Sequence, residues 1–162
     1  MSVFKTTFSR ALSVIPSDNA VVPSPFLIHS GVNTGVATNK LITITGDFIF
    51  DNISVGDVVY NISGSLAATV VSVESQSQLT LNANIFTVGG QSFRIYQQSP
   101  QTGSGNAGCY LYIGGAGNVA VTTIGGDDVV FTAVPVGTIL PVQVLKVKNS
   151  GGTTATLINA LW

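Results

Sequence analysis

The apolar residues of this chain come in short runs that are separated by glycine-rich or polar turns. Runs such as residues 58–62 and 109–113 span about five residues, which is typical of β-strands. None of them approaches the roughly 20 apolar residues that a membrane-spanning helix needs. The pattern therefore predicts an all-β protein and no membrane partner, although 45% of the residues are hydrophobic.

The predicted strands follow one another at intervals of roughly 8–12 residues, which is typical of a small sandwich or barrel. Gly64 and Ser65 predict one hairpin turn, and residues 125–128 predict another. The strands are predicted at residues 41–44, 58–62, 67–73, 79–81, 93–96, 109–113, 119–124, 129–132, 140–147 and 156–162.

The first 30 residues carry a weaker pattern. Phe4, Phe8 and Leu12 are spaced by four, which permits one short helix. Pro23 and Pro25 favour an extended backbone further along. We expect an extended arm with pieces of strand, which lies either on a neighbouring subunit or over the core of its own.

The chain divides at a polar, glycine-rich stretch over residues 97–108. We predict that residues 1–30 and 108–162 form one β-sandwich or jelly-roll-like domain. Residues 31–98 are predicted to form a small inserted β-barrel or sandwich, with residues 99–107 as a linker.

Charged residues are scarce. They make up 8% of the 162 residues, against about 25% in an ordinary soluble domain. A soluble monomer usually keeps a charged surface of mixed sign, so this composition favours a chain that covers its surface with partners. The six basic residues are scattered and the net charge is −1, so no nucleic-acid partner is expected.

The single cysteine, Cys109, excludes an intrachain disulfide. It lies in the predicted strand 109–113 and has no basic neighbour in sequence, so a buried, unreactive thiol is expected. The absence of a disulfide is consistent with synthesis in a reducing cytoplasm.

Residues that could support catalysis are few. The only histidine, His29, is flanked by Ile28 and Ser30, and no Ser–His–Asp spacing can be argued around it, so a structural role is expected. Asp127 and Asp128 at a glycine tip, and Asp47, Asp51 and Asp57 in loops, are better explained as turn residues than as metal ligands. The glycine-rich turns lack the Lys-Ser/Thr pair of a phosphate loop, so no enzyme, metal or cofactor is expected.

Two interpretations of the aromatic residues stay open. Rings on strands usually serve as core or interface anchors, but they also stack on sugars. The residues concerned are Tyr60, Tyr96, Tyr110, Tyr112 and Trp162.

Both ends of the chain resemble a known family, the head-spike base proteins of tailed phages and gene transfer agents. The resemblance lies in Ala-Leu-Ser-Val-Ile-Pro-Ser-Asp at residues 11–18, in the strand pairs at residues 110–121 and 129–142, and in the Gly-Thr-Thr-Ala-Thr…Ala-Leu-Trp close at residues 152–162. The middle, residues 31–100, resembles small β modules of phage structural proteins through residues 55–60 and 79–86.

The resemblance implies a virion structural protein, assembled in the host cytoplasm. It is expected to act as an oligomeric head-spike base, vertex or capsid decoration subunit that attaches fibres or stabilises the particle. Its expected partners are other copies of itself and capsid or fibre proteins. The alternatives are a tail or baseplate-associated appendage protein and a host glycan-binding adhesin module. Because apolar chain ends seek partners, Phe4, Phe8, Leu161 and Trp162 are the predicted assembly residues.

Overall fold

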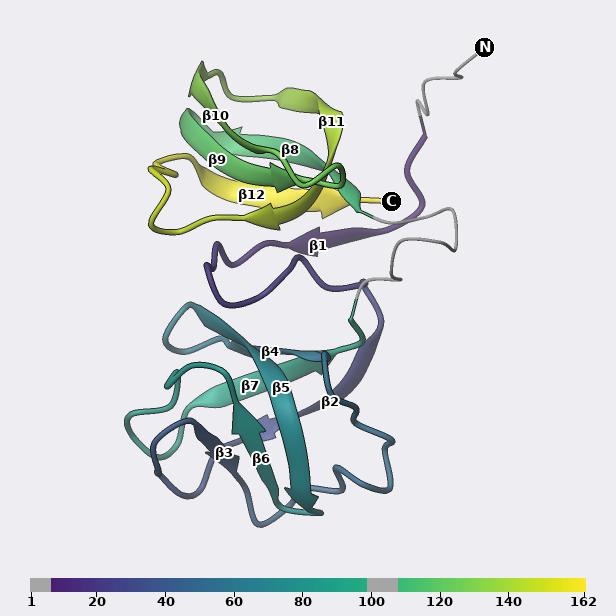
Figure 1. Cartoon of the computed structure of the whole chain (residues 1–162), viewed down its shortest axis with the longest axis vertical. Coiled ribbons are helices and arrows are strands. Elements are labelled where there is room, and N and C mark those ends of the chain that lie inside the picture. The colour runs from purple at the N-terminus through teal and green to yellow at the C-terminus, as the bar shows by residue number, and fades with distance from the viewer. Residues whose placement is uncertain (1–6, 99–107) are drawn as a thin grey trace.

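The protein is all-β, as the sequence predicted. The structure is a computed structural model that describes residues 7–98 and 108–162. Within these ranges the chain forms twelve strands and no helix; hence none of the described segments is a helix long and apolar enough to cross a lipid bilayer. The strands form two antiparallel sheets, one above the other along the long axis of the molecule (Figure 1).

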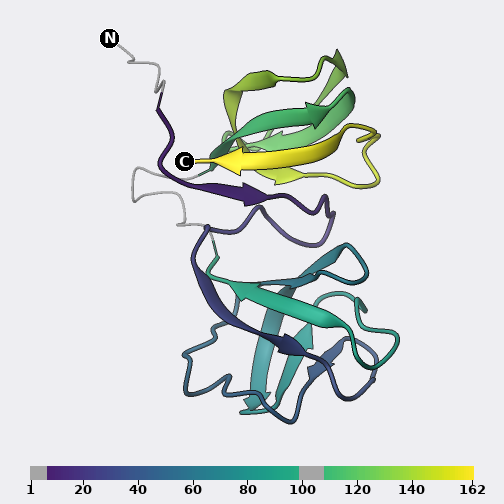
Figure 2. The same cartoon turned by 180° about the vertical axis from the view of Figure 1, so that it is seen from behind.

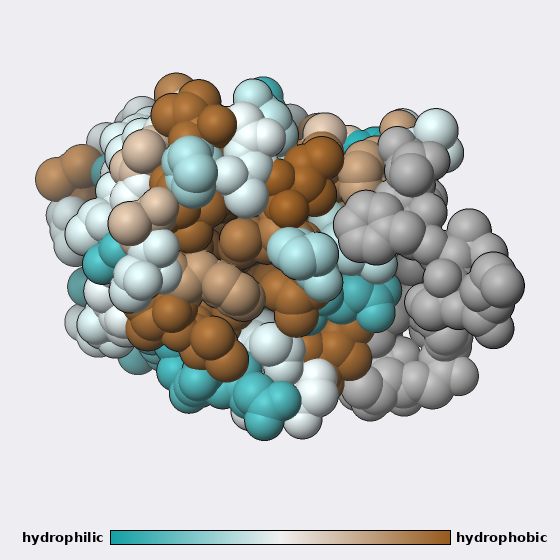
Figure 3. All heavy atoms as spheres, turned by 90° about the horizontal axis from the view of Figure 1, so that it is seen from above, coloured by the Kyte–Doolittle hydropathy of each residue, from teal (hydrophilic) through white to brown (hydrophobic). Residues whose placement is uncertain are grey.

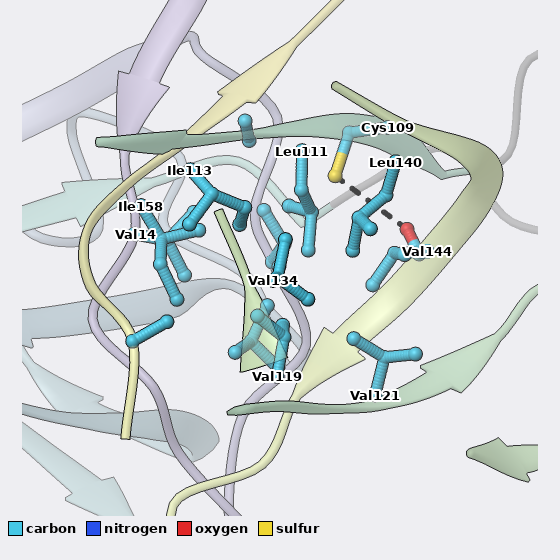
Figure 4. Close-up of a cluster of buried hydrophobic side chains, with 14 residues drawn as sticks. Val14, Cys109, Leu111, Ile113, Val119, Val121, Val134, Leu140, Val144 and Ile158 are labelled. Carbon is cyan, nitrogen blue, oxygen red and sulfur yellow. Dashed lines mark hydrogen bonds between the residues drawn. The ribbon is translucent and has the colours of Figure 1, made fainter. Parts of the chain in front are cut away.

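The first sheet combines one strand from the start of the chain with those after residue 108. Its strand order is β1 (Ala11–Ser13), β12 (Thr156–Leu161), β8 (Cys109–Gly115), β11 (Thr138–Val147), β9 (Gly117–Thr123) and β10 (Asp128–Val134). The sheet curls into a half-barrel, with the C-terminal strand β12 held between β1 and β8 (Figure 2). Its concave side holds a core of aliphatic side chains, among them Leu111, Ile113 and Val121 (Figure 4).

The second sheet is built from the strands between these two parts. Its order is β2 (Leu27–Val32), β7 (Ser92–Tyr96), β4 (Val58–Asn61), β5 (Leu66–Ser75), β6 (Gln78–Leu81) and β3 (Lys40–Ile42). One face packs on a core centred on the rings of Phe48, Phe86 and Phe93, all at most 1% exposed. Phe93 meets both other rings edge-on, at centroid distances of 6.3 Å.

The opposite face of the second sheet is covered by the segment that leaves β1. Leu12, Ile15 and Ala20 pack there against Tyr60 and Tyr96. Strand β4 is consequently buried along its whole length. The arm that the sequence predicted therefore lies against a sheet of its own chain.

Hydrogen bonds fasten this arm to the second sheet. Ser17 Oγ donates to the carbonyl of Ala67 at 2.9 Å. The carbonyl of Asn19 accepts from Thr69 Oγ1 at 2.9 Å and from Asn82 Nδ2 at 2.6 Å. The arm thus links the two sheets through both apolar and polar contacts.

Over residues 7–32, the described part of the chain's beginning, the structure has strands and no helix, although the spacing of Phe4, Phe8 and Leu12 permitted a short one. β1 pairs with β12, and β2 pairs with β7 in the second sheet. The domain boundary predicted at residue 30 therefore lies inside β2. Phe4 lies outside the described residues, and the predicted division into domains stays a prediction.

Candidate functional site

The only histidine is part of the second core. The His29 ring packs beside Phe48 and Phe93, at centroid distances of 5.4 and 5.8 Å. Its Nδ1 lies 2.7 Å from Asp51 Oδ2, and neither side chain has another side-chain hydrogen bond in the described part of the chain. The pair fastens the loop that carries Asp51 to strand β2.

The carboxylates of Asp57 and Asp128 serve local structure. Asp57 is buried, and its two oxygens accept from the backbone N–H groups of Ser54 and Gln98 at 2.8 and 3.0 Å. Lys148 and Thr122 both donate to Asp128. These bonds, with that of Lys148 the larger effect, hold the pKa of the Asp128 carboxyl below its usual range. Across residues 7–98 and 108–162, no group of three or more His, Cys, Asp or Glu side chains is arranged to hold a metal ion.

The thiol of Cys109 lies inside the first core. It is 2% exposed, and its Sγ donates a weak hydrogen bond to the carbonyl of Val144 at 3.5 Å (Figure 4). Burial raises the pKa of this thiol to about 12, which disfavours the reactive thiolate.

The aromatic residues separate into buried and surface rings. Tyr60 and Tyr96 are 2% and 4% exposed and meet edge-on at 5.4 Å, so their faces are closed to a sugar in this conformation. Tyr112 is 36% exposed. Trp162 packs partly against the first core.

Three exposed apolar side chains lie on the convex side of the first sheet. Tyr112 of β8 stands opposite Ile139 of β11, and both side chains point away from the core. Leu157 of β12 lies on the same side and is 73% exposed. We call Tyr112, Ile139 and Leu157 the outer face.

Leu157 holds an unusual backbone conformation. Its φ is 52°, in the left-handed region that side chains rarely adopt. A Cβ on the opposite residue, Gly114, would lie 2.7 Å from the Leu157 carbonyl oxygen and 2.9 Å from its Cβ, so glycine is required there. The left-handed backbone of Leu157 and the glycine opposite it are therefore linked features of the β8–β12 pair.

Two of the predicted assembly residues lie beside this surface. Leu161 stands opposite Tyr110, and the Phe8 ring packs on the Tyr110 ring at 5.7 Å. Trp162 lies on the core side, and its backbone exchanges hydrogen bonds with Arg10. The sequence analysis missed Leu157, because nothing in the local pattern distinguishes it from a core leucine.

The end of the molecule formed by the first sheet is also apolar across its middle (Figure 3). Val129 and Val130 of the edge strand β10 are 39% and 47% exposed. Since β10 has a partner strand on one side only, its other backbone edge is open.

A groove runs between the edge of β1 and strands β4 and β7. We call it the waist groove; it has a volume of about 450 Å³, within the range of roughly 300–1,000 Å³ for ligand clefts. A second hollow of about 420 Å³ adjoins it and shares Ser13, Ile15 and Ser65 with it. The residues of the waist groove used below are Ala11, Ser13, Tyr60, Arg94 and Tyr96.

Comparison of this chain with protein-family models, with curated proteins and with solved structures finds no match. The candidate surfaces are therefore interpreted from their own geometry and chemistry.

Proposed function

We propose that this chain is a structural subunit of a phage particle and that it works as a homo-oligomer. The observation that carries the proposal is the outer face, where Tyr112, Ile139 and Leu157 expose apolar area on a chain with 8% charged residues. Stable interfaces between subunits are depleted in charged residues at their centre and enriched in aromatic ones.

The family resemblance supports the same proposal. Its strand pairs coincide with β8 and β9 and with β10 and the start of β11, and its closing motif contains β12. The resembling segments therefore make up most of the sheet that carries the outer face. A role as head-spike base, vertex or decoration subunit follows from the resemblance, with capsid and fibre proteins as further partners.

The geometry also favours assembly over catalysis as the proposed role. The titratable side chains act as core, turn or surface-pair residues, as described above for His29, Asp57 and Asp128. The outer face, in contrast, exposes Leu157 at a left-handed residue, where a side chain is costly to place.

The proposal is tested by the oligomeric state of purified full-length protein, measured by size-exclusion chromatography with light scattering. We expect oligomers for the wild type and weaker assembly for Leu157→Asn, since asparagine tolerates the left-handed backbone but removes the apolar contact. The control is Val88→Asn, which alters another exposed residue on the loop between β6 and β7. This variant should assemble normally. A wild-type monomer at high concentration would contradict the proposal.

A further inference from the structure

The wall of the waist groove formed by β1 is an open strand edge. Arg10 and Val14 direct their backbone groups to β12, because the Arg10 carbonyl accepts from Trp162 N at 3.0 Å and Val14 N donates to the Ile158 carbonyl at 2.9 Å. Backbone direction alternates along a strand, so the N–H and C=O groups of Ala11 and Ser13 face the groove. They have no backbone hydrogen bond to another described residue.

The opposite wall carries a cation without an acidic partner. Arg94 of β7 is exposed and lies opposite Tyr60 of β4. All seven carboxylate side chains belong to described residues, and none forms an ion pair with Arg94. In a chain with few charges, an unpaired guanidinium beside an open strand edge attracts a carboxylate.

Tyr60 of β4 also lines the groove, but its hydroxyl is not available to a ligand. Tyr60 Oη has less than 1 Å² exposed. Burial raises the pKa of this phenol, and the nearby backbone of Ile15 partly offsets that effect. The groove therefore offers a ligand the strand edge and the guanidinium, and not this hydroxyl.

We propose that the waist groove binds an extended polypeptide segment of a partner protein, which adds as a strand to β1 and sets an acidic side chain against Arg94. Strand addition uses the free backbone groups of Ala11 and Ser13 for affinity. The apolar side chains of the segment lie along the groove, whose lining includes Ile62 and Tyr96.

A polypeptide fits this groove better than a sugar does. A sugar site needs an exposed ring face, but both rings in the groove are at least 96% buried. A strand edge, by contrast, recognises a peptide backbone directly, and the adjoining hollow that shares Ser13 extends the groove for a longer segment.

The inference deepens the proposed function, on which it rests, by naming the form in which a partner binds. The test selects displayed random eight-residue peptides against the full-length chain, and then measures the affinity of the strongest by calorimetry. We expect peptides that combine apolar residues with an acid. Arg94→Gln should weaken their binding about threefold to fivefold, because it removes the charged side chain of the groove lining, and exposed ion pairs contribute only modestly.

A second variant tests the backbone contact. Ser13→Pro removes an N–H that faces the groove, so it leaves the β1–β12 ladder intact, as proline on an open strand edge does. It should weaken peptide binding by a similar factor. Two variants serve as controls. Ser13→Ala keeps the backbone N–H, and Lys146→Gln removes a positive charge that does not line the groove. Both should bind the peptides with an affinity within about twofold of wild type.

Two outcomes would overturn the inference: no peptide is enriched, or the selected peptides bind Arg94→Gln and Ser13→Pro as tightly as wild type. The oligomeric state is measured on the same samples. If the wild type is monomeric but binds peptide, the proposed assembly is wrong and the proposed peptide site stands. If the wild type forms oligomers but binds no peptide, only the proposed peptide site is wrong.

Discussion

Ser17 Oγ donates a buried hydrogen bond to the carbonyl of Ala67 at 2.9 Å, which joins the arm of the first sheet to strand β5 of the second. Ser17 is 6% exposed and Ala67 is 3% exposed. Loss of this bond leaves an acceptor buried without its partner, whose desolvation costs about 1–3 kcal/mol. The contact is therefore a sensitive test of how firmly the two sheets are joined.

We predict that Ser17→Ala lowers the free energy of unfolding by about 1–3 kcal/mol, measured by urea denaturation. Ser150→Ala is the matched control, because that side chain is exposed and makes no hydrogen bond of its own; its effect should stay within about 0.5 kcal/mol. Equal stability of the two variants would mean that the arm is not held by Ser17.

Gly114→Ala should lower the free energy of unfolding by about 1–3 kcal/mol, because the new methyl group meets the backbone of Leu157 at 2.7 Å. The same substitution at Gly89, which has no atom within 4 Å of the added Cβ, is the control. Thermal and urea unfolding of both variants check the prediction, and a neutral Gly114→Ala would show that β12 shifts to admit the methyl group.

We expect the stability of the second sheet to depend on pH through the carboxyl group of Glu74. Lys40, Thr80 and Gln78 all donate to it and lower the pKa of its carboxyl from 4.5 to about 2. A lowered pKa stabilises the fold above pH 4.5, and this contribution is lost as the pH falls towards 2.

Lys40→Gln should therefore raise the pKa of Glu74 towards 4.5, as measured by NMR titration of its side-chain carboxyl. The stability of this variant should also fall less on acidification between pH 4.5 and 2 than that of the wild type. Lys146→Gln, whose Nζ binds the Asp18 carbonyl instead, should leave the Glu74 titration unchanged.

Cys109 should react slowly with a thiol reagent in the native protein at pH 8. Burial raises the pKa of its thiol from 9.0 to about 12 and shields the sulfur from solvent. In guanidinium chloride the same residue should react at the rate of a free cysteine. Fast labelling of the folded protein would contradict the burial of β8.

Much of the strand pattern could be predicted because each strand carries its own β-branched and aromatic residues. The run at residues 58–62 became β4 (Val58–Asn61), and the run at 140–147 became the longer β11. β1 and β2 were harder to predict, since Ala11, Ser13 and Gly31 have little tendency to form strands alone. They form because β12 and β7 offer them backbone partners from distant parts of the sequence.

Of the candidate surfaces, the sequence indicates only those residues that belong to a local apolar run. Phe8 and Leu161 lie beside the outer face, and their role in assembly stays a prediction. The exposure of Leu157 depends on a left-handed residue opposite a glycine, and the waist groove depends on how two sheets meet. Both depend on contacts between residues far apart in the sequence, which a short sequence pattern cannot predict.

The antiparallel pairing of β1 with β12 has a mechanical consequence. Arg10 and Trp162 lie at the same end of the two strands, so a load applied between the chain's described start and its last residue pulls at one end of the ladder. The hydrogen bonds then open one after another instead of sharing the load. The two strands should unzip at low force, before the strands of the second sheet begin to part.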